Sequence, residues 1–448
     1  MKNIHVFFGI SLVFIVNQTY ASVKIAIPEA QWQFTLQHIS LDTTDAAKQI
    51  KPDEQPLVIQ LKPLLKAQKY QQAHNTLRTQ LPASPSIALL LLQGQVAMQL
   101  NEYAIARQAY TKAIEQSPEL IDAHRALALI ALRQQNTDSA KKHIQKAIQL
   151  GAQDAQLFGQ LAYIHVKTDS PWSAVSGYRQ ALLLQPHNEQ WERGLLHALV
   201  ASGSINEAQT LIKQILNTTN DDSDLWLYHA QLSLQNDNPK QALRSMEIAL
   251  RNGEKAAANL VLAAQLHMQH GSGQRAVDLF RKAIEKDKRF INEVLQGISF
   301  FLQENASVKI QPLMKTLETQ SAKLDTHSRS RFYLYRAFMA QHKNKHEEAQ
   351  KYLLKAVSED NNNGQALFET ARHFDERNQK ERAAAYYVRA TVIPNVAEQA
   401  LIAHAQMEIN HKNYTKALQL LRDAYDKNPQ RHDLLQNIRQ LEQIALSQ

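Results

Sequence analysis

The sequence predicts an all-α repeat protein, a solenoid of stacked helix pairs, on three observations. Glycine and proline number only 12 and 13 in 448 residues, so few positions favour turns. Alanine recurs along most of the chain at an interval of 34 residues, a period typical of paired-helix repeats. Large apolar residues stand between the alanines at helical spacing. Such a chain buries its apolar surface between neighbouring repeats rather than inside several closed domains.

The composition also excludes several classes of function. The absence of cysteine excludes disulfides, thiolate metal sites, cysteine nucleophiles and a lipid-modified cysteine, so a lipoprotein is not expected. The formal net charge of +8 is modest for this length. No long run of lysine and arginine is interleaved with aromatic residues, which argues against nucleic-acid binding.

The N-terminus has the pattern of a cleavable signal peptide over residues 1–21. Lys2 supplies positive charge, residues 6–16 (VFFGISLVFIV) are uncharged and mostly apolar, and Thr19 and Ala21 occupy the small-residue positions before a cleavage site. We expect cleavage after Ala21 and export to the periplasm of a Gram-negative bacterium. The alternative is an uncleaved anchor, but the apolar run is shorter than the roughly 20 residues of a membrane helix. No stable membrane insertion is expected after cleavage.

Residues 22–53 form an expected lead-in before the repeats. Apolar and more polar residues alternate there with a strand-like period, the apolar ones being Val23, Ile25, Ile27, Trp32, Phe34 and Leu36. One interpretation is an extended segment that covers the exposed face of the first repeat. The alternative is a strand that adds to a sheet of a partner.

The repeat is defined by columns of residues in equivalent positions. One column of small residues comprises Ala106, Ala140, Ala174, Ala208, Ala242, Ala276, Ala349, Ala383 and Ala417. A second follows seven residues, or two helical turns, later at Ala113, Ala147, Ala181, Ala249, Ala283, Ala356, Ala390 and Ala424. Between them stand Tyr110, Ile144, Tyr178, Ile212, Met246, Phe280, Leu353, Tyr387 and Leu421. This alternation of small and large residues predicts close packing of neighbouring helices.

The partner helix of each pair has its own small residues, twelve positions before the first column: Gly94, Ala128, Ala162, Ala230, Ala264, Ala337, Ala371 and Ala405. Turn-forming residues separate the two helices, for example at Asn101, Asn136, Gly203, Asn238, Gly271 and Asn378. Several units end at a proline, where the second helix must stop, namely Pro118, Pro186, Pro394 and Pro429.

These residues resemble the tetratricopeptide repeat. Residues 89–118 (LLLLQGQVAMQLNEYAIARQAYTKAIEQSP) match its motif in order at Gly94, Tyr103, Ala106, Tyr110, Ala113 and Pro118. The resemblance covers roughly residues 54–431. It implies a right-handed superhelical solenoid of about ten to eleven helix-turn-helix repeats. The first helix of each unit would then line a concave groove that binds peptides or partner helices.

Within this solenoid we expect an N-terminal part over residues 54–324 and a C-terminal part over 325–431. The first unit keeps only Tyr70, Ala73 and Leu77 of the pattern. In the degenerate eighth unit, Ile310, Met314 and Leu317 replace the usual residues, and the next unit begins five residues late, around residues 326–330. This junction is interpreted either as a hinge or as a passive surface insertion. Residues 432–448 are expected to form a C-terminal capping helix, amphipathic over 432–446.

The family resemblance also implies which side chains face the groove. Its fifth, ninth, twelfth and thirteenth positions give Gln95, Gln99, Arg125, Arg133, Tyr163, Lys167, Arg193, His197, Gln231 and Gln235, followed by Gln265 and Gln269. Arg125, Arg133, Lys167 and Arg193 would form either a site for an acidic segment or an ordinary solvated surface. A chaperone-type carboxylate clamp is not expected, because the ninth position lacks asparagine.

The sequence contains no constellation that predicts catalysis or a cofactor. There is no His-Glu-x-x-His, no phosphate-binding glycine-rich loop and no serine elbow. His342 and His346 straddle an expected turn, while His267 and His270 lack an obvious acidic third ligand, so both pairs are interpreted as ordinary histidines rather than metal ligands. We therefore expect no enzyme activity.

The sequence thus predicts a periplasmic scaffold or adaptor that binds protein partners of a cell-envelope assembly or energy-transduction complex. Residues 177–200 and 224–243 resemble exported repeat proteins encoded beside TonB/ExbB/ExbD systems, and secretion or assembly components are other expected partners. The alternative function is a polysaccharide-secretion solenoid that guides an anionic polymer. Exposed aromatic residues would favour that alternative, but many tyrosines and phenylalanines fall at expected packing positions.

Overall fold

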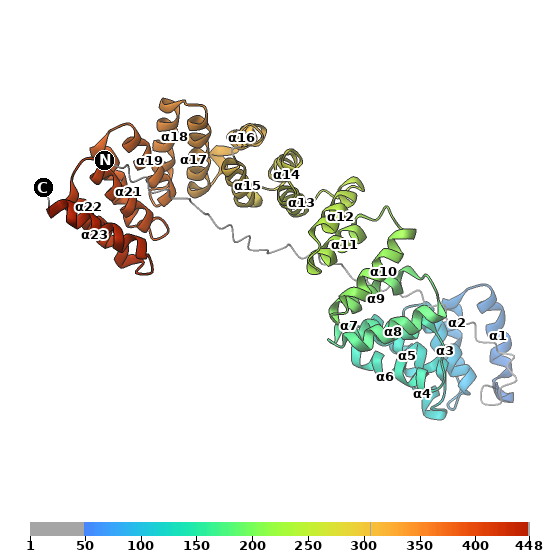
Figure 1. The fold of residues 1–448 in the computed structure, drawn as a ribbon. Coiled ribbons are helices and arrows are strands. Elements are labelled where there is room, and N and C mark those ends of the chain that lie inside the picture. The colour runs from blue at the N-terminus through green and yellow to red at the C-terminus, as the bar shows by residue number, and fades with distance from the viewer. Residues whose placement is uncertain (1–48, 305, 447–448) are drawn as a thin grey trace. The chain divides into compact units, whose positions relative to one another are not determined.

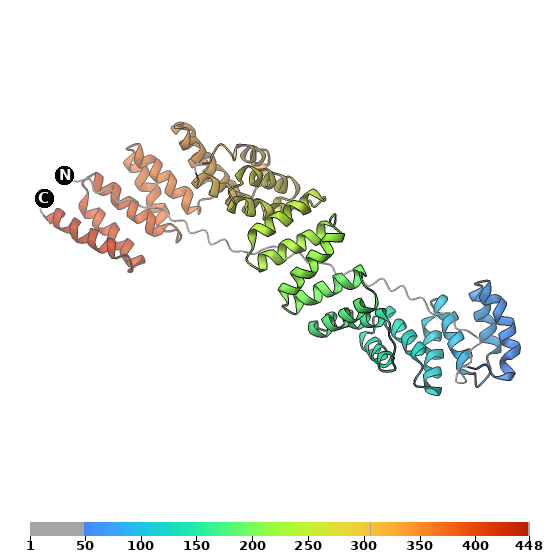
Figure 2. The ribbon, with the colours of Figure 1, turned by 45° about the vertical axis from the view of Figure 1, so that its right-hand side comes forward.

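The structure, a computed structural model, describes residues 49–304 and 306–446. The predicted signal peptide and residues 22–48 of the predicted lead-in lie outside the described residues. The described chain divides into two compact units, residues 49–237 and residues 238–446. In both units, helices follow one another in chain order as helix-turn-helix pairs, coloured from blue to red in Figures 1 and 2. The all-α repeat fold predicted from the sequence is confirmed.

The unit of residues 49–237 consists of η2 (Pro52–Glu54), α1 (Gln55–Lys66), α2 (Tyr70–Gln80), α3 (Ile87–Gln99), α4 (Tyr103–Gln116), α5 (Ile121–Arg133), α6 (Thr137–Gln149), α7 (Ala155–Lys167), α8 (Pro171–Leu184), α9 (Glu189–Ala201), α10 (Ile205–Thr218) and α11 (Ser223–Gln235). In each pair the first helix is called helix A and the second helix B. Thus α3, α5, α7, α9 and α11 are A helices.

The unit of residues 238–446 consists of α12 (Pro239–Arg251), α13 (Ala257–Gln269), α14 (Gly273–Lys286), η3 (Lys288–Phe290), α15 (Ile291–Gln303), α16 (Gln311–Gln320), η4 (Ser321–Lys323), α17 (Thr326–His342), α18 (His346–Glu359), α19 (Gly364–Glu376), α20 (Lys380–Thr391), α21 (Ala397–Asn410), α22 (Tyr414–Lys427) and α23 (His432–Leu446). Here α12, α14, α16, α18, α20 and α22 are B helices. No helix within the described residues is long and apolar enough to cross a membrane.

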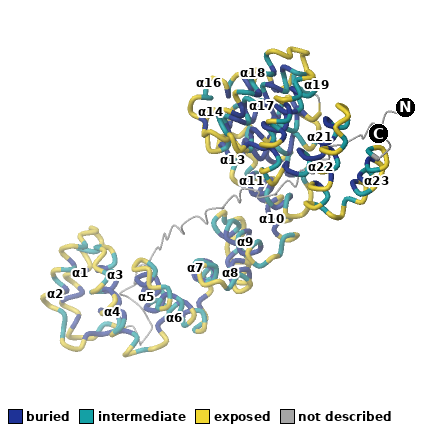
Figure 3. The backbone as a smooth tube through the Cα atoms, turned by 90° about the vertical axis from the view of Figure 1, so that its left-hand side faces the viewer, coloured by how far each residue is buried: buried dark blue, intermediate teal, exposed yellow. Residues whose placement is uncertain are grey.

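The predicted columns of small and large residues form the interior of both units. All nine alanines of the first column are fully buried, and so are all eight of the second. The large residues between them are buried as well, at 0–5% exposure. Helix B of one pair packs against helix A of the next, as α8 does on α9 and α20 on α21. Buried residues, dark blue in Figure 3, therefore lie where helices face one another.

The turn between helices A and B repeats the same backbone conformation, in most pairs at an interval of 34 residues. A residue with positive φ stands in this turn at Gln68, Asn101, Gln135, Asp169, Gly203, Asp237, Gly271, Asn344, Asn378 and Lys412. Two turns differ by one residue from the sequence prediction. Asn136 and Asn238 follow the left-handed residue and act as N-caps, because their side-chain oxygens accept the backbone N–H of Ser139 and Gln241, each at 3.1 Å.

The eighth unit is irregular, as its sequence predicts. Its helix B, α16, has only 10 residues, although Ile310, Met314 and Leu317 are all buried. After the short helix η4, α17 begins at Thr326 with Asp325 as its N-cap and runs for 17 residues. The N-terminal part of this long helix is held by Ser330, whose hydroxyl donates to the carbonyl of Ala356 at 2.7 Å. The extra residues before the next unit therefore belong to helix α17, which is extended at its N-terminal end.

The last helix, α23, has the bounds 432–446 expected of the amphipathic capping helix. Its apolar residues Leu434, Ile438 and Leu441 are buried at 0–5% exposure in the cluster formed with α21 and α22. An ion pair between Arg422 and Glu442, at 2.6 Å, links α22 to the exposed side of α23. The helix thus covers the apolar face of the final pair, as a solenoid end requires.

Candidate functional site

All ten residues predicted to face a groove lie on A helices of the first unit, α3, α5, α7, α9 and α11. None is fully buried, and Gln99, Arg133, Lys167 and Gln235 are exposed. We call this set the helix-A surface: Gln95, Gln99, Arg125, Arg133, Tyr163, Lys167, Arg193, His197, Gln231 and Gln235. Gln265 and Gln269 lie on α13 of the second unit.

Two of the four predicted basic residues are used for contacts between repeats. Arg125 of α5 forms an ion pair with Asp154, the N-cap of α7. Arg193 of α9 forms the equivalent pair with Asp222, the N-cap of α11. In both pairs the residues are 29 positions apart and each side chain is 19–21% exposed. These guanidinium groups therefore hold consecutive A helices together, and their charge is compensated inside the unit.

The charge balance around Arg193 is reflected in pKa values. Burial would lower the pKa of Arg193, but hydrogen bonds and charge from Asp222 and Glu189 raise it. Burial would likewise raise the pKa of Asp222, but Arg193 and the backbone N–H groups of α11 lower it below its usual value. Both groups are therefore ionised at neutral pH. Positive charge on the helix-A surface is left chiefly to Arg133 and Lys167.

Neighbouring A helices bring Tyr163, Lys167 and His197 together. The ammonium group of Lys167 lies 5.5 Å from the centre of the Tyr163 ring, one turn away on α7. Helix α7 packs against α9, which carries His197. Burial lowers the pKa of His197, and the positive charge of Lys167 lowers it further. His197 is therefore neutral at pH 7, and its ring can accept a hydrogen bond.

A row of polar side chains follows the ninth position of successive A helices. Tyr163, His197 and Gln231 are 34 residues apart in sequence and lie on α7, α9 and α11. Nδ1 of His197 and Oε1 of Gln231 are buried atoms without a hydrogen-bond partner. A buried polar atom without a partner costs about 1–3 kcal/mol. Both atoms are closed to solvent, so a bound chain would remove that cost only after neighbouring side chains move to expose them.

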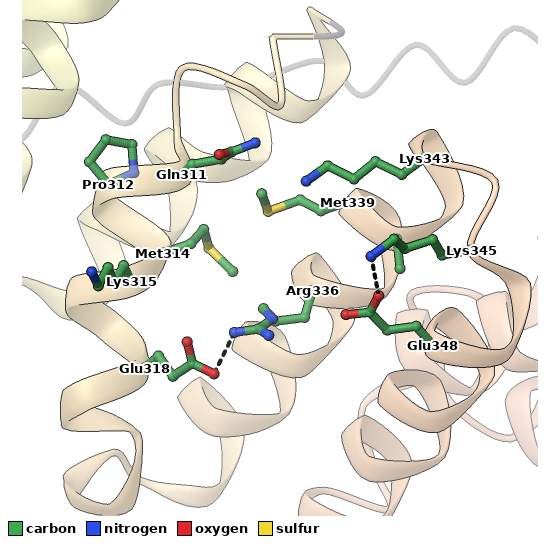
Figure 4. A pocket seen from close by; sticks show the side chains of 11 residues that line it. Gln311, Pro312, Met314, Lys315, Glu318, Arg336, Met339, Lys343, Lys345 and Glu348 are labelled. Atoms are coloured by element: carbon green, nitrogen blue, oxygen red, sulfur yellow. Dashed lines mark ion pairs between the residues drawn. The ribbon is translucent and has the colours of Figure 1, made fainter.

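The second unit contains a cleft of about 610 Å³ beside the irregular junction. It lies between α16 on one side and α17 with the start of α18 on the other (Figure 4). We call it the α16–α17 cleft. Its lining comprises Gln311, Pro312, Met314, Lys315, Glu318, Arg336, Met339, Ala340, Lys343, Lys345 and Glu348. Sequence reasoning missed this cleft, although the shortened eighth unit was a signal that packing is interrupted there.

The histidine pairs singled out in the sequence lie as follows. His342 is the last residue of α17 and His346 the first of α18, so they flank a turn. His267 does have an acidic partner, because its Nε2 lies 2.7 Å from Glu247, which also binds Arg275 at 3.0 Å. In the part of the chain that the structure describes, no group of three or more histidine, aspartate or glutamate side chains could hold a metal ion.

Comparisons with known proteins concern the repeats. The family model of the tetratricopeptide repeat matches residues 91–155 and 227–289. A search of curated proteins returned no match. Among solved structures, YrrB, described as a TPR protein with an unusual peptide-binding site, is 18% identical, covers 39% of this chain and 90% of its own, and has a TM-score of 0.37.

Two further solved structures are similar over larger parts of this chain. Yeast Tom70 is 15% identical over 89% of this chain and 97% of its own, with a TM-score of 0.36. PilF of Pseudomonas aeruginosa is 16% identical over 47% of this chain and 95% of its own, with a TM-score of 0.35. The family match and the 34-residue period of buried alanines agree. The helix pairs within residues 91–155 and 227–289 are therefore tetratricopeptide repeats, and the other pairs share their period of buried alanines.

Proposed function

We propose that this protein is a periplasmic scaffold that binds a polypeptide partner on the helix-A surface. Tetratricopeptide repeats generally mediate protein–protein interactions, and their fold is typically a non-catalytic scaffold. The observation that carries the proposal is the row of Tyr163, His197 and Gln231. It presents two buried acceptor atoms without partners beside the exposed cation of Lys167. A polypeptide supplies backbone N–H donors for such acceptors.

The proposed location rests on the N-terminal sequence. Residues 1–21 carry the charge, apolar run and small residues of a cleavable signal peptide. Cell fractionation and N-terminal sequencing of the protein purified from its bacterium test this proposal. The expected result is recovery in the periplasmic fraction with Ser22 as the first residue. Recovery in the cytoplasm, or a chain that retains Met1, would overturn it.

The proposed partner belongs to a cell-envelope assembly or an energy-transduction complex. Support comes from the resemblance of residues 177–200 and 224–243 to repeat proteins encoded beside TonB/ExbB/ExbD systems. Components of secretion or assembly machines are the other candidates within the same proposal. All of these partners are proteins, so the class of ligand that the helix-A surface must bind is a polypeptide.

A pull-down from crosslinked periplasm tests the scaffold. The tagged wild-type chain should recover one stoichiometric protein. A triple variant, Tyr163→Ala, His197→Ala and Gln231→Ala, should lose it. The matched control changes three exposed residues of B helices α4, α6 and α8, as Gln108→Ala, Gln145→Ala and Gln180→Ala. Equal recovery by both variants would contradict binding on the helix-A surface.

The same pull-down separates the scaffold from a polymer-guiding solenoid, because recovery of polysaccharide without protein would favour the polymer. Aromatic rings for sugar stacking have limited access in the second unit. Cationic groups lie over the rings of Tyr352, Tyr333, Phe374 and Tyr386, at 3.9–5.3 Å from the ring centres. These rings already stack on guanidinium or ammonium groups, so the structure offers the polymer little support there.

A further inference from the structure

We propose that the α16–α17 cleft is a second binding site, specific for an acidic peptide segment that is anchored by an apolar side chain. This site lies in the second unit, and its residues are separate from the helix-A surface. The proposal rests on three features of the cleft: an opening between helices, an apolar floor and an excess of positive charge.

The opening results from the short helix α16 and the way α17 is held beside it. Arg336 of α17 forms an ion pair with Glu318 of α16 at 2.6 Å and donates to the hydroxyl of Tyr352 on α18 at 2.5 Å. Its guanidinium also lies 4.7 Å from the centre of the Tyr352 ring. Three helices are thus joined through one side chain, which keeps α16 in place at one end of the cleft (Figure 4).

The floor of the cleft is apolar and adaptable. Met314 extends from α16 and Met339 from α17, and both face the space between the helices (Figure 4). Ala340 completes this apolar lining; it and Met314 are only 3–4% exposed, so the half-buried Met339 offers the more accessible apolar surface. Methionine side chains are flexible and polarisable, so they accommodate apolar groups of different shape. A volume of about 610 Å³ is within the range of ligand sites and suits a few side chains of a peptide.

The rim of the cleft is positively charged. Its lining contains four cationic side chains and two carboxylates, a net charge of +2. The carboxylates are already paired, Glu318 with Arg336 and Glu348 with Lys345 at 3.3 Å. Lys315 and Lys343 are exposed, and the ammonium group of Lys343 points toward α16 (Figure 4). These two lysines are available for carboxylates of a ligand.

An apolar floor beside free lysines favours an acidic peptide over a polyanion. A sugar polymer would satisfy the lysines but would leave the methionine floor without a complementary group. A peptide that combines leucine, methionine or phenylalanine with flanking aspartate or glutamate fits both features. Electrostatic complementarity of this kind contributes specificity and fast association.

The test is a peptide-display selection on the full-length protein, followed by binding measurements with the enriched peptides. Selected peptides are retested on the double variant Lys315→Glu, Lys343→Glu and on Met339→Gln, which keeps the side-chain length but removes the apolar sulfur end. Both variants should weaken acidic peptides by about tenfold or more. The matched control is Lys282→Glu, Lys427→Glu, which makes the same charge change at exposed lysines outside the cleft.

Methionine methyl resonances give a second readout, because Met314 and Met339 should shift when the peptide binds to wild-type protein. Far-ultraviolet circular dichroism establishes that each variant is folded.

The proposal is overturned if no enriched peptide loses affinity in the cleft variants, or if the control weakens binding equally. It is also overturned if alginate, which has no apolar side chain, displaces the peptide as well as the unlabelled peptide does. Peptides that depend on Tyr163, His197 and Gln231 report on the helix-A surface instead, so the two proposals can fail separately.

Discussion

Arg193 and Asp222 bind each other across two consecutive repeats, and Asp222 has a second task in the same place. Its carboxylate accepts the backbone N–H groups of Asp224 at 2.8 Å and Leu225 at 3.1 Å, which caps helix α11. One carboxylate thus caps the start of a helix and fixes the preceding repeat to it. The same arrangement occurs at Asp154, which caps α7 and binds Arg125.

This double use can be separated by two substitutions of Asp222. Asp222→Asn keeps a capping oxygen but loses the charge, so we expect the free energy of unfolding to fall by about 0.5–1 kcal/mol. Asp222→Ala loses the cap as well, and the fall should reach about 1–2 kcal/mol. Urea denaturation of the full chain measures both. Added salt should reduce the effect of the asparagine variant. If Arg193→Ala and Asp222→Asn are additive in the double variant, the ion pair contributes nothing.

Position 194 requires glycine because of side-chain packing and not because of a turn. A Cβ atom at this position of α9 would lie 2.5 Å from Cε1 and Cζ of Tyr178, which is 2% exposed. We expect Gly194→Ala to lower the free energy of unfolding by about 1–3 kcal/mol through overpacking, although alanine favours helices. In a Tyr178→Leu background the same substitution should cost less, because the ring is gone. Thermal unfolding of the four chains measures this, and an equal cost in both backgrounds would refute the contact.

The left-handed turn residue offers a stabilising substitution. Gln135 has φ 56°, a conformation that costs a residue with a side chain about 1–2 kcal/mol. Gln135→Gly removes this cost but increases the freedom of the unfolded chain, so the expected net gain is about 0.5–1 kcal/mol. Gln135→Ala keeps the unfavourable conformation and is the matched control, with an expected change near zero. A melting temperature that rises equally in both variants would show that backbone strain is not the cause.

Two facing histidines make the first unit sensitive to acid. Nδ1 of His124 lies 3.1 Å from Nδ1 of His143, so the two rings share one hydrogen bond that needs an unprotonated nitrogen. Burial, then the charges of His124 and Lys142, lower the pKa of His143 from 6.5 to about 4. Between these values the folded state binds fewer protons than the unfolded state. Stability therefore falls as the pH drops from 6.5 toward 4.

The variant His143→Gln removes this titration. Between pH 7 and pH 5 the wild-type protein should lose about 1–2 kcal/mol more free energy of unfolding than the variant. Urea denaturation at the two pH values gives the comparison, and circular dichroism at pH 7 establishes that the variant is folded. His165, His197 and His229 also have lowered pKa values, so some acid sensitivity should remain in the variant. Identical losses in the two proteins would exclude His143 as a contributor.

The repeat itself was predictable because small and large residues recur at one period. Ala106 and Ala113 mark one helix face, and Tyr110 between them could be assigned to the interior before any helix was seen. The capping helix was also predictable from the sequence, since its apolar residues follow helical spacing up to Leu446. The turns were predicted less well. The sequence predicted Asn136 as the turn residue. In the structure Gln135 has the left-handed conformation instead, and the side chain of Asn136 caps helix α6.

The sequence placed the residues of the helix-A surface on helices but did not reveal the partners of their charges. Arg125 and Arg193 lie on the expected A helices, yet their partners Asp154 and Asp222 come from the next repeat. The sequence alone does not show that residues 29 positions apart form an ion pair, because this depends on the distance between stacked repeats. The α16–α17 cleft is a similar case, because Met314 and Met339 line the same cleft although they lie on different helices.

The order of residues along this chain decides which helix faces are buried, because a regular period places the same side chains on the same face of every repeat. It also decides where helices stop, through caps, prolines and left-handed turn residues that act within a few positions. Packing between repeats decides the remainder: which charges neutralise one another, which polar atoms of His197 and Gln231 are left without partners, and where a cleft opens beside α16. These outcomes depend on distances between side chains far apart in sequence, which a local pattern does not contain.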